Sequence, residues 1–557
     1  MKKYIIGLVA AMAVMSPACD TLDFDPTGQY SDATAYSSIK NLDLYVKDMY
    51  TIYHNIANVE CGSSLNMLED AWSDLIKTSW YGVGQSQNKF FSQENSMSVE
   101  TNPRSNWSTM YTHIRKFNYL LVDAKAGKLS KLPQDEVAAR VAEVRFLRAF
   151  AYQELAKFHG GVILRVSEDK VDDQNENAKA RASKEETWDF ILGEYDKAIA
   201  DLPESWSTGD YGRITKQGAQ AMKARAALYA GRWDAAYTAA DNVIKSNKFQ
   251  LSNNLGDIYT NSNNSELIIP VLYELGVKQH NFDSYLCPPS FADAKGYKDQ
   301  YGAAATPTEE YVSQFDIKVG NNWESFDWNN LAKYGNEPFK NRDPRFYQSI
   351  LANGSTFQGN EIQCWEGGTD QCMKYAMTGQ DNVHRSTTGY YIRKFLSSKT
   401  GTSGYNFVNN LSDQHWIEMR LAEVYLIRSE AAARQNKWAE AYNDLNVIRN
   451  RATLPNKPQK NSWEEYLVDL QKERICELGL EGHRYDDIMR WGISQEVLNG
   501  KRTHGVWVTK NNDGSFSYEI IEADDYDRIF PKKYEIFPIP YNEIQNNPLC
   551  DQNEAWK

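Results

Sequence analysis

Two absences limit what this chain can do. Beyond its first residues it has no run approaching about 18 consecutive apolar residues, so no segment of its body is long enough to cross a bilayer as a helix. It also lacks excess positive charge, because 74 acidic residues outnumber 61 basic ones and the net charge is −13. Since phosphate binding relies on clustered Lys and Arg, nucleic acid is not an expected partner.

The motifs of several catalytic classes are also missing. The sequence has no Gly-x-Ser-x-Gly elbow, no phosphate-binding Gly-Lys-Ser/Thr loop and no His-Glu-x-x-His pair, and its 8 histidines are scattered singly. Carboxylates are abundant, so the sequence does not exclude an acid/base pair like that of glycosidases. Many carboxylates are, however, expected in any acidic protein. We expect no enzymatic activity and no cofactor, and the sequence leaves a structural metal ion undecided.

Cysteine is sparse, with 7 residues and no Cys-x-x-Cys pair, which disfavours a zinc site. Cys364 and Cys372 are close enough in sequence to clip a loop through a disulfide in an oxidising compartment. The sequence leaves their paired and unpaired states open.

Residues 1–18 have the three parts of a secretory signal peptide: two lysines, an apolar run, and small residues that lead into Cys19. Cleavage before Cys19 would expose a thiol that can carry lipid and tether the protein to a membrane. The polar residues 19–31 would then form a flexible leash. A plain signal peptide without lipidation is the alternative, because Ser16 is a poor match to the residue usual at its position.

Helical periodicity dominates the rest of the chain. Apolar residues recur at spacings of three and four through residues 141–158 and 188–202, which predicts helices that bury more than one face. Residues 232–237 (Arg-Trp-Asp-Ala-Ala-Tyr) are echoed by residues 437–442 (Lys-Trp-Ala-Glu-Ala-Tyr), and each copy follows an Ala-rich helix. This pattern is typical of tetratricopeptide repeats. We predict a mostly α fold on a tetratricopeptide-like scaffold of helical pairs.

Two regions follow the leash, an N-terminal one at 32–250 and a C-terminal one at 251–557 that contains a late helical pair at 416–452. Residues 251–402 are rich in Asn, Gly, Ser, Pro and aromatics, which predicts a large irregular insertion of loops and short strands. A hairpin is expected at 506–520, around an Asn-Asn-Asp-Gly turn. Binding residues usually lie on loops held by a rigid scaffold, so the insertion is the first place to look for a site.

Several sequence blocks occur in a fixed order along nearly the whole chain. They are residues 22–26 (Leu-Asp-Phe-Asp-Pro), 142–150, 341–346 (Asn-Arg-Asp-Pro-Arg-Phe), 421–425, 449–452, 481–492 (beginning Glu-Gly-His-Arg-Tyr-Asp-Asp), 537–540 and 553–556. Each is weak alone, but jointly they closely resemble the SusD/RagB family of surface glycan-binding lipoproteins.

The resemblance implies a protein that does no chemistry. It is similar to lipid-anchored lids that face the cell exterior and close over a SusC-like TonB-dependent outer-membrane transporter. Such a lid binds an oligosaccharide or polysaccharide and seals it against the transporter for uptake. The alternatives are a lid of the same type for peptides or another nutrient, and a surface glycoside hydrolase.

Most of the matching blocks are expected to be structural. Residues 342–345 should tie a turn through charge-assisted hydrogen bonds. Residues 483–487 should cap and brace the helix before Trp491, although Glu481 and His483 allow a catalytic interpretation.

A glycan site needs exposed aromatic platforms flanked by carboxylates, amides and Arg, and 13% of this chain is aromatic. The resemblance implies an arc built from an early loop and the middle insertion, without fixing its residues. By composition the candidates are Asp70, Trp72, Trp80, Tyr81, Tyr285, Trp323, Trp328, Tyr391 and Arg393. Each of these Trp residues fits a place in the hydrophobic core nearly as well as a place in a ligand-binding surface. Trp80 and Trp323 are the favoured ligand contacts, because loop-like sequence lies next to them.

Overall fold

The computed structural model describes residues 32–57, 69–78, 91, 97–100, 106–166, 178–294, 302–373, 384–397, 412–524 and 526–557. Over these residues the protein is mostly helical, and its strands form short two-stranded pairs. None of the helices in these ranges combines the length and the apolarity needed to cross a membrane. The predicted signal peptide, Cys19 and the leash lie outside the described residues.

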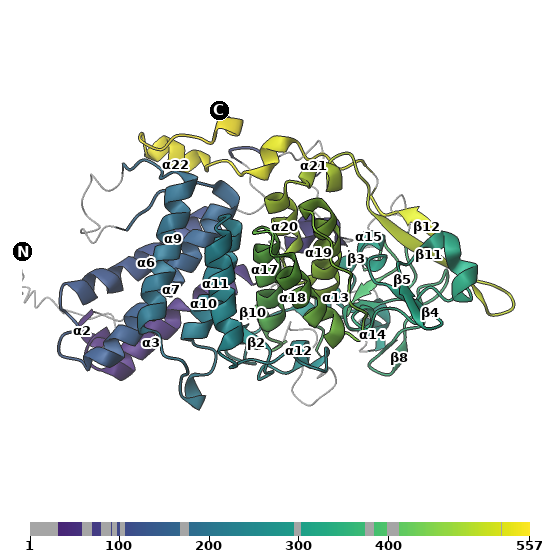
Figure 1. Ribbon diagram of the computed structural model, residues 1–557, viewed down its shortest axis with the longest axis horizontal. Helices are drawn as coiled ribbons and strands as arrows, with labels where there is room; N and C mark the ends of the chain where they lie inside the picture. The colour runs from purple at the N-terminus through teal and green to yellow at the C-terminus, as the bar shows by residue number, and fades with distance from the viewer. Residues whose placement is uncertain are drawn as a thin grey trace, which may run out of the picture.

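Long helices packed side by side form the body of the molecule (Figure 1). In chain order they are α3 (Ile39–Met49), α6 (Trp107–Lys125), α7 (Gln134–His159), α9 (Lys184–Asp201), α10 (Lys216–Tyr229), α11 (Trp233–Lys245), α17 (Leu421–Ala433), α18 (Trp438–Arg451) and α19 (Trp463–Leu478). From α6 to α18 each helix of this series packs against the next, and α11 lies directly against α17. The two repeat copies are therefore neighbours in space, which confirms the tetratricopeptide-like scaffold.

Local sequence explains where these helices begin and how closely they approach. The side chains of Ser183 and Glu186 form a capping box that starts α9. The alanines of α10 and α17 are buried at the crossing with their neighbours, where small side chains allow close contact. The Arg434 guanidinium lies 5.0 Å from the ring of Trp233 and 3.3 Å from that of Trp463, and so it joins three helices of the series.

The insertion leaves the helical series after α11 and returns to it at α17. Its elements are α12 (Asp257–Thr260), β2 (Leu267–Val271), α13 (Phe282–Leu286), α14 (Pro289–Ala294), β3 (Ala305–Pro307), α15 (Glu309–Val312), β4 (Ile317–Val319), β5 (Asn322–Glu324), η3 (Trp328–Tyr334), α16 (Phe346–Ser349), β6 (Ile350–Leu351), β7 (Thr356–Phe357), β8 (Asn360–Glu361) and β9 (Tyr391–Ile392). The predicted loops with short strands and helices are confirmed.

Antiparallel pairing attaches the insertion to the rest of the chain. Strand β2 pairs with β10 (Trp416–Arg420), which leads into α17, and β3 pairs with β1 (Ile76–Thr78) from the N-terminal region. Strands β6 and β9 pair with each other beside β3. The remaining early elements are α2 (Asp32–Ala35), α4 (Thr51–Ile56) and η1 (Glu69–Trp72).

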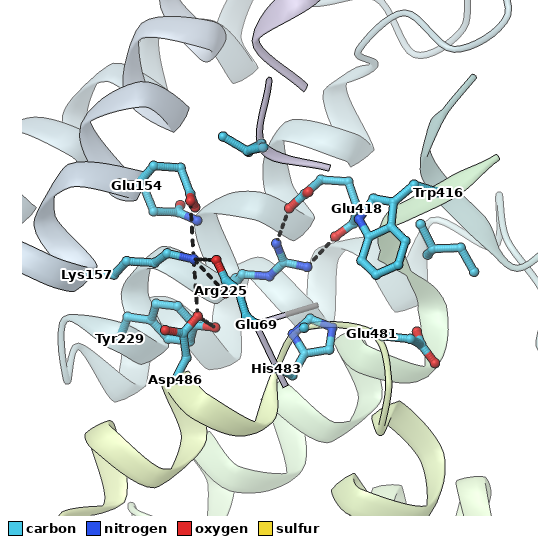
Figure 2. A pocket seen from close by; sticks show the side chains of 14 residues that line it. Glu69, Glu154, Lys157, Arg225, Tyr229, Trp416, Glu418, Glu481, His483 and Asp486 are labelled. Carbon is cyan, nitrogen blue, oxygen red and sulfur yellow. Dashed lines mark hydrogen bonds and ion pairs between the residues drawn. The ribbon is translucent and has the colours of Figure 1, made fainter. Parts of the chain in front are cut away.

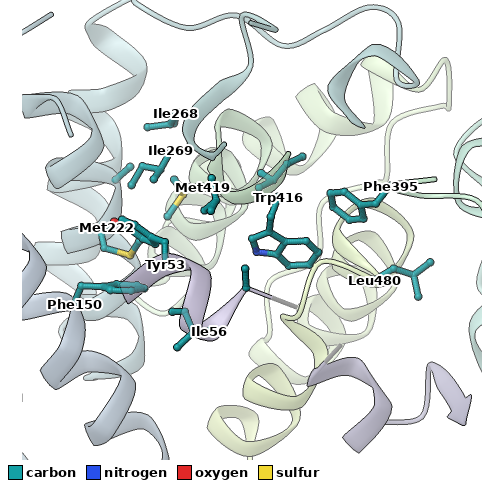
Figure 3. Packing of buried hydrophobic residues seen from close by; sticks show 14 of the residues in the cluster. Tyr53, Ile56, Phe150, Met222, Ile268, Ile269, Phe395, Trp416, Met419 and Leu480 are labelled. Atoms are coloured by element: carbon teal, nitrogen blue, oxygen red, sulfur yellow. The ribbon is translucent and has the colours of Figure 1, made fainter. Parts of the chain in front are cut away.

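One hydrophobic core joins the segments on the two sides of the insertion (Figure 3). From the N-terminal side come Tyr53, Ile56, Phe150 and Met222. From the insertion comes Phe395, and from the later chain come Trp416, Met419 and Leu480. All eight are buried, so the helical body and the insertion are stabilised by the same apolar burial.

The C-terminal segment runs back over the ends of the helices (Figure 1). It contains α20 (Arg484–Trp491), α21 (Ser494–Val497), β11 (His504–Lys510), β12 (Phe516–Glu522), η6 (Lys532–Glu535), α22 (Tyr541–Asn546) and η7 (Glu554–Trp556). The Phe537 amide donates to the Phe158 carbonyl at 2.8 Å, and the Asn553 side chain donates to the His159 carbonyl at 3.2 Å. The chain end is thereby fixed to the end of α7.

The predicted braces are present. Arg342 donates to the carbonyls of Val312, Phe315 and Pro338, and Arg345 pairs with Asp343 at 2.8 Å, so both arginines tie the turn before α16. In α20, Arg484 pairs with Asp74 at 2.9 Å, and Asp487 pairs with Arg474 and Arg490. These motifs position secondary structure elements.

The predicted hairpin is also present. Strands β11 and β12 pair in antiparallel register, with Val506 opposite Ile520. The Val506 amide donates to the Thr388 carbonyl at 2.8 Å, and a Cβ atom at Gly505 would lie 2.4 Å from the Thr388 Cα atom. Glycine at this position therefore lets the hairpin backbone lie directly on the insertion.

Candidate functional site

Two of the early candidate residues are buried. Asp70 accepts hydrogen bonds from the backbone amides of Gly482 and Arg484, at 3.0 and 3.1 Å, and burial raises the pKa of its carboxyl to about 6. Trp72 is 3% exposed and packs edge-on against Tyr485. Neither side chain can present a surface to a ligand, which corrects the prediction for both. They fasten η1 to α20.

Tyr391 is also corrected. It is fully buried on β9, and its hydroxyl donates to the Asp370 carbonyl at 2.8 Å. Arg393, two residues later, is half-buried, and burial lowers the pKa of its guanidinium. Tyr285 on α13 is half-buried as well. Trp80 and Tyr81 lie outside the described residues.

The two candidate disulfide cysteines are both buried. The Cys372 amide donates to the Cys364 carbonyl at 3.4 Å, so the two residues close a loop through the backbone. Cys364 carries a free thiol in the structure, and burial raises its pKa well above the ordinary value.

Four half-buried aromatic side chains lie where the hairpin meets the insertion, and we call them the aromatic strip: Trp328, Trp365, Phe516 and Tyr518. The ring centroids of Trp328 and Tyr518 are 5.9 Å apart, and those of Trp365 and Phe516 are 5.4 Å apart. Phe516 and Tyr518 alternate along β12, so they share one face of the hairpin and join the two pairs. Three separate segments thus contribute two ring pairs to the same side of the hairpin.

Polar groups flank the aromatic strip. The ammonium of Lys510 lies 4.7 Å from the ring centroid of Trp365, and its side chain is exposed. Burial, and then the charge of Glu337, raise the pKa of Tyr518 to about 12, so its hydroxyl stays protonated at neutral pH. Rings that offer an apolar face beside hydrogen-bonding groups suit ligands with flat CH faces and many hydroxyls.

Of the predicted residues, only Trp328 belongs to the aromatic strip. Trp323 is half-buried on β5, where the Lys318 ammonium lies 5.9 Å from its ring centroid. Trp365, Phe516 and Tyr518 were missed by the composition-based search. The alternation of Phe516, Tyr518 and Ile520 in the predicted hairpin was the available indication that two rings share a face.

A polar cavity lies at the junction of α7, α10, β10 and α20 (Figure 2). Its volume is about 40 Å³, which is room for a few water molecules and too little for a sugar ring. Ion pairs fill its wall: the Lys157 ammonium lies 3.3 Å from Glu69, 3.2 Å from Glu154 and 3.4 Å from Asp486. The cavity is a charged structural junction.

The arrangement around His483 does not suit acid/base chemistry. Burial lowers the pKa of His483 to about 4. Burial also disfavours the Glu481 carboxylate, but Arg420 and Lys394 outweigh it and lower its pKa to about 2. Both groups therefore keep one protonation state near neutral pH. Among the described residues, no group of three or more His, Cys, Asp or Glu side chains is arranged to hold a metal ion.

Comparisons with known proteins agree with this fold. The family model described as "SusD family" matches residues 265–556, and one described as "Starch-binding associating with outer membrane" matches residues 29–228. The "Starch-binding protein SusD" of Bacteroides thetaiotaomicron is 24% identical over 80% of this chain and 77% of its own. The "SusD-like protein P25" of Formosa agariphila is 22% identical over 96% and 95%.

The fold is also similar to solved structures. A SusD-like carbohydrate binding protein from Bacteroides fragilis superposes with a TM-score of 0.75 at 22% identity, over 93% of this chain and 99% of its own. Together the two matched ranges cover most of the helical series, most of the insertion and the C-terminal segment, and they leave out residues 229–264 with α11 and α12. The chain belongs to the SusD family.

Proposed function

We propose that this protein captures glycans at the cell surface through the aromatic strip. The observation that carries the proposal is a set of two pairs of partly exposed rings on the same side of the hairpin, with hydrogen-bonding groups beside them. Sugars stack their CH faces on such rings, while their hydroxyls bond to the flanking groups. The printed names of the starch-binding relative and the carbohydrate-binding structure support the same ligand class.

Other predicted residues remain proposed contacts where the structure does not bury them. These are Tyr285, Trp323 and Arg393, together with Trp80 and Tyr81. Strand β1 ends at Thr78, which pairs with Ala305, and the neighbouring Ala304 amide donates to the Tyr285 carbonyl at 2.9 Å. Tyr285 therefore lies close to the point from which the chain continues to Trp80.

We further propose that the protein is the lid of a SusC-like TonB-dependent transporter, held in the outer membrane by lipid on Cys19. The family description that mentions association with the outer membrane supports this location. Residues 19–31 would give the tether slack, so the lid could open for a glycan without leaving its transporter. The aromatic strip would hold the glycan until closure.

We expect Trp365→Ala to weaken binding of the cognate glycan at least tenfold, which corresponds to about 1.4 kcal/mol. The substitution removes one end of the stacking surface while the hairpin keeps its other contacts. The measurement is isothermal titration against a panel of purified polysaccharides, with the melting temperature of each variant recorded. The matched control is Trp438→Ala, because Trp438 is also half-buried but begins α18 in the helical series.

The same panel separates the alternatives. Saturable binding of arrayed peptides without any glycan binding would show a peptide-binding lid instead. Steady release of reducing ends by the purified protein would show a hydrolase. Equal losses of affinity in Trp365→Ala and Trp438→Ala would contradict the aromatic strip as the site.

We expect mass spectrometry of the mature protein to find an acylated Cys19 at its N-terminus. Two or three acyl chains give stable anchoring because each buried CH₂ contributes about 0.8 kcal/mol. Cys19→Ser should release the protein from the membrane fraction with its glycan affinity intact. An unmodified Cys19 in membrane-associated protein would overturn the tether.

A further inference from the structure

Helix α15 begins with two acidic residues that contact two different parts of the site. Glu309 accepts a hydrogen bond from the indole N–H of Trp328 at 2.7 Å and another from the Tyr390 hydroxyl at 2.5 Å. Glu310 accepts from the backbone amide of His504 at 3.0 Å, at the start of β11. The consecutive carboxylates therefore hold η3 and the hairpin, the elements that carry three of the four rings in the aromatic strip.

The remaining contacts of Trp328 are apolar. Its ring lies 5.1 Å from Phe326 and 6.2 Å from Phe339, centroid to centroid, in addition to its contact with Tyr518. Ring packing allows an indole to turn or slide at small cost, whereas a hydrogen bond fixes which edge of the ring faces inward. The bond to Glu309 thus determines which part of the Trp328 ring is left for a ligand.

We propose that Glu309 is the positioning residue of the aromatic strip, and that its carboxylate orients the Trp328 ring for glycan stacking and makes binding depend on pH. The proposal rests on the proposed function for its glycan part. The orientation of the indole is a property of the free protein and can be measured without a ligand.

The surroundings of Glu309 give the direction of the pH dependence. Its side chain is 6% exposed, and the groups that face it are Tyr390, Trp328, Arg342 and Glu310. Glu310 in turn contacts the imidazole of His504 on β11 at 2.6 Å, and that contact raises the pKa of His504. Burial is the largest influence and raises its pKa to about 7. Hydrogen bonds to an ionised acceptor are roughly twice as strong as neutral ones. The hold on Trp328 therefore tightens as the pH rises through about 7, when the carboxyl loses its proton.

The first test follows the indole itself. The full protein is labelled with ¹⁵N-tryptophan, and Trp328→Phe identifies the Trp328 resonance. We expect this resonance to move between pH 5.5 and 8.5 with a midpoint near 7. Glu309→Gln keeps an acceptor for the indole and cannot ionise, so the movement should vanish, whereas Glu310→Gln should retain it. Unchanged movement in Glu309→Gln, or a static resonance in the wild type, would overturn the proposal.

The second test uses a polysaccharide that the wild-type protein binds. We expect its affinity to rise about threefold from pH 6 to pH 8 in the wild type, and to stay flat in Glu309→Gln. The same rise in both proteins would contradict the positioning role. If the wild type binds no glycan, the proposed function fails, while the indole titration still decides the role of Glu309.

Discussion

Arg420→Met is expected to lower the free energy of unfolding by about 3–5 kcal/mol. Arg420 is 1% exposed, and its guanidinium pairs with Glu266 at 2.7 Å, Glu477 at 2.6 Å and Glu481 at 2.7 Å. These carboxylates come from the residue before β2, the end of α19 and the turn before α20. Removing the cation leaves buried negative charge that the remaining cations compensate only in part. The resulting repulsion destabilises the contact between the insertion and the helical series.

Urea unfolding followed by circular dichroism measures this loss. The matched control is Arg502→Met, whose partners Glu522 at 2.5 Å and Asp527 at 2.7 Å are exposed. Water and salt screen exposed ion pairs, which therefore add little to stability, so the control should unfold almost like the wild type. A loss in Arg420→Met as small as in Arg502→Met would mean that the buried pairs barely stabilise the fold.

Acid is expected to unfold the protein between about pH 4.5 and pH 2. Burial opposes ionisation of Asp487, but Arg474 and Arg490 outweigh it and lower its pKa to about 2, as Arg420 and Lys394 do for Glu481. A carboxyl with a lowered pKa stabilises the fold fully above its unfolded pKa and loses that contribution as the pH falls through its folded pKa. Two such groups are together worth roughly 5 kcal/mol.

Other carboxyls act in the opposite direction at neutral pH. Burial raises the pKa of Asp70 to about 6 and that of Glu418 to about 7. Their contribution is complete below the unfolded pKa and is lost as the pH rises through 6 to 7. The melting temperature should therefore peak near pH 5, and Glu418→Gln should flatten its decline toward pH 8. A melting temperature that still rises from pH 6 to pH 9 would contradict this balance.

The helical scaffold was predictable because its sequence pattern is local. Spacings of three and four along residues 141–158 and 188–202 correspond to α7 and α9. The two Trp-containing repeat copies correspond to the starts of α11 and α18. The hairpin followed from its turn residues and alternation. In each case the residues that determine the element lie within a few positions of one another.

The site was only partly predictable, because exposure is not a local property. Trp72 and Tyr391 have the composition of ligand contacts, yet they are buried by α20 and by the segment around Asp370. Trp328 was predicted, but the rings that continue it come from Trp365 and from β12 far along the chain. No short-range sequence pattern predicts that these segments contact one another.

By itself, the sequence determined the mostly α scaffold, the position of the insertion, the hairpin and the charged braces. These features follow from periodicity, turn residues and ordered motifs, which depend only on residues close together in the chain. The tertiary structure alone decided which aromatic side chains remain open to a ligand and which carboxylates face them. Long-range pairing of β1 with β3, and docking of the hairpin on the insertion, bring distant residues together. Burial, exposure and the resulting pKa values depend on those contacts, so they emerge only when the chain has folded.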